Sequence, residues 1–170
     1  MKKKGKIICK NLLEFAAAIG VAVFILVFVA GTVRVEGSSM ESTYHTGDRL
    51  LIWKLGYRPA LGDVVVVREE NGGDKFLLKR VIAAGGQTVL LDGKEGAVFV
   101  DGQRLEEPYL EDGQALSERE AGRTFAWKLS GDEVFVMGDN RAISLDSRIF
   151  GPLPQKDVVG KVLLCLWAGK

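Results

Sequence analysis

The pattern of hydrophobic and polar positions divides the chain into one long apolar segment and a body of short alternating runs. Residues 15–33 carry no charge. At about 1.5 Å of helical rise per residue, this stretch nearly matches the roughly 30 Å hydrocarbon core of a bilayer. We therefore predict a transmembrane helix at residues 15–33, preceded by a tail at residues 1–14 and followed by a body at residues 34–170.

A cleaved signal peptide is the competing interpretation of the apolar segment. Val29, Ala30 and Gly31 loosely resemble a small-residue cleavage site. The apolar regions of signal peptides run for about 7–15 residues, which is shorter than this segment. Retention as a membrane anchor is therefore favoured.

The body is predicted to be mainly β. Its β-forming residues come in short runs separated by glycine-bearing turns, and Asp101 with Gly102 forms a hairpin turn signal. Residues 111–123 are the most polar and least patterned stretch, so we expect an exposed loop there, within a small inserted β subdomain at residues 88–132. The predicted strands are residues 49–54, 62–67, 76–83, 88–91, 97–100, 133–137 and 158–167.

Charge gives the expected orientation. A chain of 170 residues with 47% hydrophobic and 26% charged residues fits one compact domain and a membrane segment. Arg34 follows the apolar segment, so the positive-inside rule places the N-terminus in the cytoplasm and the body outside the cell. The body has more Asp and Glu than Lys and Arg, which argues against a nucleic-acid partner. The residues that form the basic cluster before the segment are Lys2, Lys3, Lys4, Lys6 and Lys10.

Cysteine and histidine usage argues against disulfide and metal chemistry. Cys9 and Cys165 lie on opposite sides of the apolar segment and are not expected to pair. Cys165 follows Leu163 and Leu164, so it is predicted to be a small buried hydrophobic residue. The sequence has no cluster of His and Cys that could bind a metal, and it predicts no metal and no cofactor.

The candidate chemistry centres on a short run of small residues directly after the anchor, Gly37 to Met40. A serine such as Ser39 in this run is a weak nucleophile until a neighbouring base takes its proton. The chain has one histidine, His45, and a serine–histidine mechanism that uses it lacks a defined acid. His45 is expected to be an exposed turn residue, which leaves Lys79 as the leading base.

Strand alternation predicts the surroundings of Lys79. It places Leu77 and Val81 on the same face as Lys79. A lysine between these apolar residues would be desolvated, which lowers its pKa. The alternative is an edge-strand lysine whose amine reaches water.

Residues 138–148 form a second polar stretch directly after a predicted strand. A calcium loop of the EF-hand type is excluded because Arg141 and Ile143 occupy ligand positions. A turn held together by Asp–Arg pairs accounts for most of these side chains. Ser144 is the one we expect to lie nearest the chemistry.

Taken together, these stretches resemble the sequence boxes of type I signal peptidases, the membrane-bound serine proteases that remove signal peptides from exported proteins. Residues 37–40 resemble the nucleophile box, and residues 62–65 resemble the strand box that follows it. Residues 79–82 resemble the lysine box, and residues 138–148 resemble the terminal box. The four boxes occur in the family's order.

The resemblance implies a role for each matching residue. Ser39 would be the nucleophile, Lys79 the general base and Ser144 a hydrogen-bond partner that orients the lysine amine. Some members have serine at the position of Gly37, and its hydroxyl helps to bind the oxyanion. In this chain the oxyanion hole near Gly37 and Ser38 would rely more on the backbone amide of Ser39. Ser42 stands where many members have proline. The implied structural supports are Asp139, Arg141, Asp146 and Arg148.

The resemblance also implies the fold and the partners. It indicates a β-rich body with a strongly bent sheet, in a compact protein with a single anchor in the cell membrane and a catalytic domain outside the cytoplasm. The implied substrates are secretory preproteins with small residues before the cut. The lipid bilayer is the other implied partner.

Two other functions remain as alternatives. Self-cleaving SOS repressors share serine–lysine chemistry, but the matching bond, Ala30–Gly31, lies inside the apolar segment. The second alternative is a membrane-anchored β module without catalysis that contacts lipid or a partner through Met40, Trp53 and Tyr57.

Overall fold

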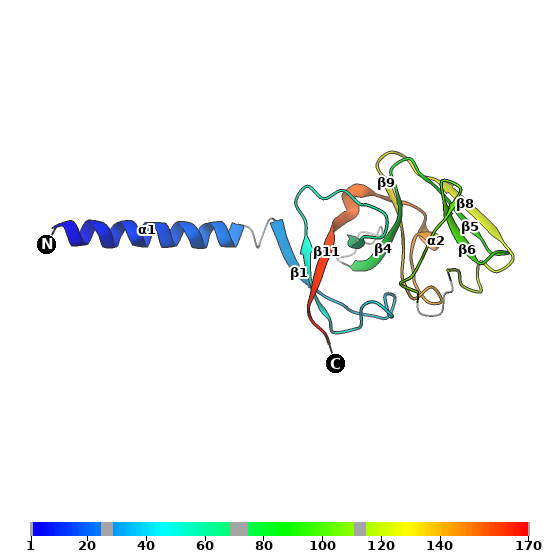
Figure 1. The fold of residues 1–170 in the computed structure, drawn as a ribbon, viewed down its shortest axis with the longest axis horizontal. Helices are drawn as coiled ribbons and strands as arrows, with labels where there is room; N and C mark the ends of the chain where they lie inside the picture. Colours follow the sequence, from blue (N-terminus) through cyan, green and yellow to red (C-terminus); the bar gives the residue numbers. More distant parts are fainter. Residues whose placement is uncertain (1, 25–28, 69–74, 111–114, 170) are drawn as a thin grey trace.

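The computed structural model describes residues 2–24, 29–68, 75–110 and 115–169. Helix α1 (Lys2–Phe24) extends away from a body of β-strands, as Figure 1 shows. The strands form a seven-stranded sheet and a four-stranded sheet. The body is therefore mainly β, as the sequence predicted.

The N-terminal segment differs from the prediction at both ends. Helix α1 already begins at Lys2 and therefore includes the predicted tail. Residues 30–33, predicted to be part of the anchor, belong to strand β1 (Ala30–Arg34), because their backbone pairs antiparallel with β2 (Arg49–Trp53). No helix within the described ranges is both long enough and apolar enough to cross a membrane.

The seven-stranded sheet is antiparallel at every pairing, in the order β1-β2-β11-β3-β4-β9-β10. Strand β4 lies inside this sheet, between β3 and β9. A short helix, α2, precedes β10, and a 3-10 helix, η2, leads into β11. The bounds of these elements are β3 Val64–Arg68, β4 Phe76–Ala84, β9 Glu133–Met137, α2 Ser147–Phe150, β10 Leu153–Pro154, η2 Gln155–Asp157 and β11 Val158–Trp167.

The four-stranded sheet, in the order β7-β6-β5-β8, is inserted between β4 and β9. It lies at the end of the body opposite α1 (Figure 1). Asp101 and Gly102 join β6 to β7 with positive φ angles of 50° and 79°, as a tight hairpin turn requires. The strands are β5 Thr88–Asp92, β6 Ala97–Val100, β7 Gln103–Arg104 and β8 Thr124–Lys128.

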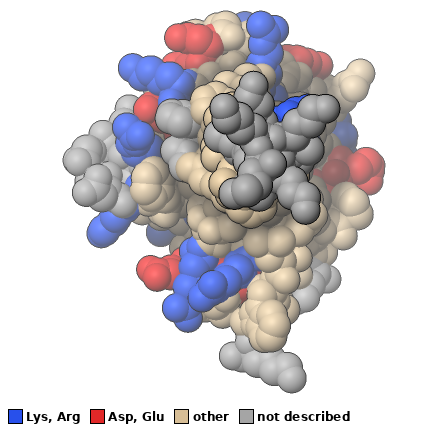
Figure 2. Space-filling view, turned by 90° about the vertical axis from the view of Figure 1, so that its left-hand side faces the viewer, with Lys and Arg blue, Asp and Glu red and all other residues tan. Residues whose placement is uncertain are grey.

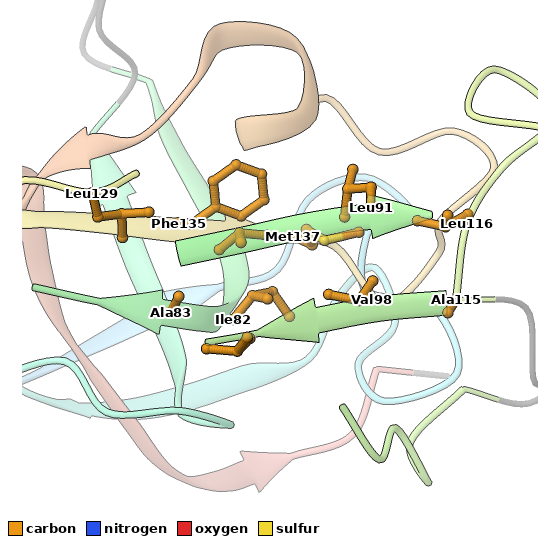
Figure 3. Packing of buried hydrophobic residues seen from close by; sticks show 11 residues of the cluster. Ile82, Ala83, Leu91, Val98, Ala115, Leu116, Leu129, Phe135 and Met137 are labelled. Carbon is orange, nitrogen blue, oxygen red and sulfur yellow. The ribbon is translucent and has the colours of Figure 1, made fainter. Parts of the chain in front are cut away.

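A hydrophobic cluster joins the small sheet to β4 and β9 of the large one (Figure 3). Phe135 from β9 packs against Trp127 from β8, with ring centroids 4.9 Å apart. Ala115 and Leu116 are buried in the same cluster. The prediction of an exposed loop at residues 111–123 is therefore wrong for these two residues, because their apolar side chains complete the cluster. It is also wrong for Glu120, which is buried and pairs with Arg148. Residues 111–114 lie outside the described residues.

The second half of β11 is more exposed than predicted. Cys165 is a free, exposed cysteine, so its prediction as a buried residue is wrong. The physical reason is that the hydrophobic clusters of the described body take up Val158, Val159 and Val162 but no residue of 163–167. Exposed hydrophobic side chains flank this cysteine, and they are Leu163, Leu164, Leu166 and Trp167.

Candidate active site

The nucleophile candidate lies on a tight turn that follows β1. Glu41 N donates to Ser38 O at 3.1 Å and Tyr44 N donates to Met40 O at 2.8 Å. Met40 is only 1% exposed and packs in the hydrophobic cluster beneath the turn. These hydrogen bonds and the packing of Met40 hold the turn in place, and Ser39 on it is half-buried. The non-catalytic alternative required Met40 to contact lipid or a partner. Because Met40 is buried, it is not available for such a contact.

Lys79 reaches the turn from the interior strand β4. Its Nζ lies 2.7 Å from Ser39 Oγ and 3.1 Å from the carbonyl oxygen of Leu78. The residue is 2% exposed. The alternative of an edge-strand lysine that reaches water is therefore wrong, since β4 has a neighbouring strand on both sides.

Burial changes the acidity of this amine. Desolvation lowers the pKa of Lys79 from its usual 10.5 to about 8. Arg148 acts in the same direction, whereas Asp146 and Asp139 favour the charged ammonium and limit the decrease. A neutral amine at hydrogen-bond distance from a serine hydroxyl can accept its proton, so the pair can act as nucleophile and base.

A buried ion pair links the lysine strand to the polar stretch. Arg80 Nε and Nη2 donate to the two carboxylate oxygens of Asp139 at 2.9 and 2.6 Å. Thr43 Oγ1 donates to the same carboxylate at 2.5 Å, and Arg80 Nη1 donates to Gly62 O at 2.8 Å. One guanidinium thus connects the nucleophile turn, the strand box and the terminal box.

The polar stretch also bonds directly to the nucleophile turn. Asn140 N donates to Ser39 O at 3.0 Å. Asp146 accepts from Gly138 N at 3.0 Å and from two nitrogens of Arg148 at 2.9 Å each. Burial alone would raise the pKa of Asp146, but Arg148 and these hydrogen bonds lower it below its usual range. Asp146 therefore stays ionised and secures the stretch beside Ser39.

The structure does not bring Ser144 into a hydrogen bond with Lys79. Ser144 is 4% exposed, and its Oγ has no partner with normal hydrogen-bond geometry among the described residues. It nevertheless lies close enough to the Asp146 carboxylate to contribute to the lowered pKa of that group. It does lie close to the turn. A Cβ added to Gly138 would be 2.2 Å from Ser144 Oγ and 2.4 Å from Ser39 O.

The other residues predicted around the nucleophile have varied surroundings. Gly37 is exposed, with a φ of 87° that favours glycine. Ser38 is half-buried. The backbone N–H of Ser39 donates no hydrogen bond within the described structure and is free to bind an oxyanion. His45 is exposed and bonds Asp48 through its backbone N–H, which does not support a serine–histidine pair.

Three residues of the inserted part pair with the site and were missed from the sequence. Glu107 forms an ion pair with Arg141, and Glu120 lies 3.3 Å from Arg148. The ring of Tyr109 stacks on Arg80. Their only sequence signal is an acidic or aromatic residue in a polar stretch, which does not indicate a partner. Within the described residues, no group of His, Cys, Asp and Glu is arranged to hold a metal ion.

A groove of about 620 Å³ runs between β1 and the start of β4. Strand β1 is an edge strand of the large sheet, so its outer backbone groups can pair with an extended peptide. Its lining includes Leu78, the residue that precedes Lys79. It is lined by Thr32, Val33, Arg34, Val35, Glu36, Val66, Lys75, Phe76, Leu77 and Leu78.

Comparisons with known proteins point to one family. Residues 8–167 match the family model described as "Signal peptidase, peptidase S26". A probable signal peptidase I-1 of Synechocystis sp. is 35% identical over 165 residues, which cover 91% of this chain and 80% of the relative. Signal peptidase IB of Staphylococcus aureus is 31% identical over 180 residues, with coverage of 93% and 91%.

A solved structure also matches the fold. The crystal structure of a signal peptidase I from Enterococcus faecalis aligns with a TM-score of 0.52 and 27% identity, over 64% of this chain and 98% of that one. The family model and the relatives both span most of the chain. The chain therefore belongs to the signal peptidase family of serine endopeptidases, peptidase S26.

Proposed function

We propose that this protein removes N-terminal signal peptides from secretory preproteins by a Ser39–Lys79 mechanism. The observation that carries the proposal is the 2.7 Å contact between Lys79 Nζ and Ser39 Oγ, made by an amine with a pKa of about 8. Neutral Lys79 takes the proton of Ser39 as its oxygen attacks the peptide carbonyl. Protonated Lys79 then gives this proton to the leaving amine as the carbon–nitrogen bond breaks, which forms the acyl-enzyme and restores the neutral lysine. Neutral Lys79 next takes a proton from the water that attacks the acyl-enzyme, and it returns that proton to Ser39 Oγ as the product acid is released.

The developing oxyanion needs hydrogen-bond donors at the nucleophile. The free backbone N–H of Ser39 supports this role. Gly37 supplies no hydroxyl there, so this amide is the main donor in the proposal. Asp139, Arg141, Asp146 and Arg148 act as structural supports, since their contacts hold the turn and the terminal box together.

The groove beside β1 supports an extended peptide as the substrate. A peptide that pairs with the free edge of β1 gains backbone hydrogen bonds without regard to its sequence. Specificity then comes from the side chains that face the groove wall, and in this proposal small residues are required before the cut. The Ala30–Gly31 bond of a self-cleaving mechanism is instead held in the pairing of β1 with β2.

The proposed site of action is the outer surface of the cell membrane, with the N-terminus in the cytoplasm. The uncharged segment before β1 is the proposed anchor. Support comes from exposed apolar residues on the adjoining strands β2 and β11, such as Trp53 and Trp167. On the side of α1, uncharged residues occupy much of the visible face, with both Lys or Arg and Asp or Glu side chains around them (Figure 2). Such a surface suits contact with lipid.

The test uses the full chain in detergent with a secretory preprotein as substrate. We expect one cut, and N-terminal sequencing of the product identifies its position. Ser39→Ala should abolish the cut, whereas Ser130→Ala, which changes an exposed serine in the turn before β9, should not.

Substrate variants test the specificity. Replacing the alanine directly before the cut with phenylalanine should prevent processing, because the bulky side chain does not fit the groove wall. Equal cleavage of both substrates, or an active Ser39→Ala protein, would refute the proposed function.

A further inference from the structure

The inserted part of the chain provides a partner for each arginine of the catalytic boxes. Arg141 pairs with Glu107, and Arg148 pairs with Glu120 at 3.3 Å. The guanidinium carbon of Arg80 lies 3.8 Å from the centroid of the Tyr109 ring. These three residues come from the segment between β7 and β8, which is far in sequence from the nucleophile.

Tyr109 contacts the nucleophile turn directly through its backbone and indirectly through Arg80. Its carbonyl oxygen accepts a hydrogen bond from Ser42 Oγ at 3.2 Å. Its ring covers Arg80, which also donates to Asp139, Thr43 and the carbonyl oxygen of Gly62. Both Ser42 and Thr43 belong to the turn that carries Ser39.

The backbone of this turn needs such support. Ser42 has a φ of 88°, which lies in the left-handed region that side-chain-bearing residues adopt only at a cost of roughly 1–3 kcal/mol. A turn with that conformation persists when its surroundings hold it. The hydrogen bond from Ser42 to Tyr109 is a direct restraint on the strained residue.

We propose that Tyr109 is a positioning residue that holds the nucleophile turn through Ser42 and Arg80. The inference rests on the proposed function for its kinetic test. Displacement of a reacting group by about 1 Å can reduce a rate by roughly 100-fold. Loss of Tyr109 therefore acts on the chemical step and leaves substrate binding in the groove beside β1 unchanged.

Kinetics of the full chain in detergent test the proposal. We expect Tyr109→Leu to lower kcat by about 10- to 100-fold and to change KM by less than about twofold. Tyr109→Phe should keep most of the activity, because it keeps the ring over Arg80 and the backbone carbonyl. Phe125→Leu is the matched control, since Phe125 lies in the same inserted part of the chain and its ring also contacts an arginine, Arg123, at 5.0 Å.

Hydrogen exchange supplies a measurement that does not need activity. The backbone amides of Glu41, Thr43 and Tyr44 should exchange faster in Tyr109→Leu and in Ser42→Ala, and at the wild-type rate in Phe125→Leu. Ser42→Ala keeps the Tyr109 ring and removes only the hydroxyl, so it still decides the question if Tyr109→Leu lowers Tm.

Three outcomes would overturn the inference. The first is that the amides of the turn exchange at the wild-type rate in both Tyr109→Leu and Ser42→Ala. The second is that Tyr109→Leu has the kcat of the wild type. The third is that Tyr109→Phe and Tyr109→Leu lose kcat equally. A wild-type protein that cleaves no preprotein would instead refute the proposed function, and the exchange measurement would still judge the role of Tyr109.

Discussion

Lys79 Nζ lies 2.7 Å from Ser39 Oγ although Lys79 is one of the largest fully buried side chains of the described body. Burial and reactivity are linked here. An exposed lysine remains protonated near neutral pH and cannot accept a proton, whereas this one has a pKa of about 8. The same desolvation that favours the neutral form of the amine makes its charged form costly to keep inside the fold.

The pH dependence of cleavage should follow the titration of Lys79. The neutral amine is the working form, so kcat/KM should rise with pH up to about 8 and then level off. At pH 7 roughly a tenth of the enzyme has a neutral lysine. Initial rates on a preprotein from pH 6 to 10 measure the profile.

Lys79→Arg is the control for that profile. A guanidinium keeps the positive charge but stays protonated and cannot accept the Ser39 proton. Its activity should fall to that of Ser39→Ala. Substantial activity in this variant, or a rate that does not depend on pH below 8, would contradict the assignment of Lys79 as the base.

Lys79→Met should make the protein more stable while it abolishes activity. The lowered pKa of Lys79 corresponds to about 3 kcal/mol spent on keeping a charged amine buried at pH 6. Methionine fills similar space without a charge, so the free energy of unfolding should rise by about that amount, less the contribution of the two lost hydrogen bonds. Denaturant unfolding of both proteins at pH 6 gives the difference.

The difference in free energy of unfolding between Lys79→Met and the wild type should also change with pH in a defined direction. Between pH 8 and 10.5 the unfolded state binds the lysine proton more tightly than the folded state does, so the free energy of unfolding of the wild type rises with pH over this interval. The difference in free energy of unfolding between Lys79→Met and the wild type should therefore decrease from about pH 8 to pH 10.5. If this difference stayed constant over that pH range, Lys79 would not have a lowered pKa in the folded protein.

The alternation of β4 predicted most of the surroundings of Lys79 correctly. Leu77 and Val81, predicted to share its face, both lie in one hydrophobic cluster, and Leu78 lies in another. The pattern fails at Ala83, which packs beside Ile82 in the same cluster. An irregularity in the pairing of β4 with β9 between Val81 and Ala83 accounts for this, and strand periodicity does not reveal such a bulge.

The partners of the polar stretch were harder to predict than the stretch itself. Asp146 and Arg148 are close in sequence, so an Asp–Arg pair was an expected local contact, and it forms. The Arg141–Glu107 pair joins the segment after β9 to the segment after β7, and only tertiary packing brings them together. The residues missed at the site are therefore those whose contacts depend on where the inserted sheet docks.

Gly138→Ala should damage the protein, because the added methyl group has no room. It would lie 2.2 Å from Ser144 Oγ and 2.4 Å from the backbone oxygen of Ser39. The Ser39 oxygen also accepts the Asn140 hydrogen bond, so the turn cannot move without breaking it. We expect a loss of about 3 kcal/mol in the free energy of unfolding and a strong loss of activity.

Gly131→Ala is the matched control for that substitution. A Cβ at Gly131 would meet no atom within 4 Å, and Gly131 does not have a positive φ. Its free energy of unfolding and its activity should match the wild type. A Gly138→Ala protein as stable and active as Gly131→Ala would show that the turn is looser than its contacts indicate.

Ser144→Ala tests the lysine-orienting role implied by the resemblance. Lys79 has contacts with Ser39 and Leu78, but an ammonium formed during the reaction has three N–H donors. Ser144 Oγ is buried close to the Ser39 backbone and to the Asp146 carboxylate without a hydrogen bond of normal geometry, so we expect it to accept the third. Removal of this hydroxyl should change the free energy of unfolding by less than about 1 kcal/mol, whereas kcat should fall about tenfold through the loss of one hydrogen bond. Unfolding and steady-state kinetics on the same preparation separate the two effects. A kcat equal to that of the wild type would remove Ser144 from the mechanism, and a large loss of stability would show that its hydroxyl has a partner in the resting protein.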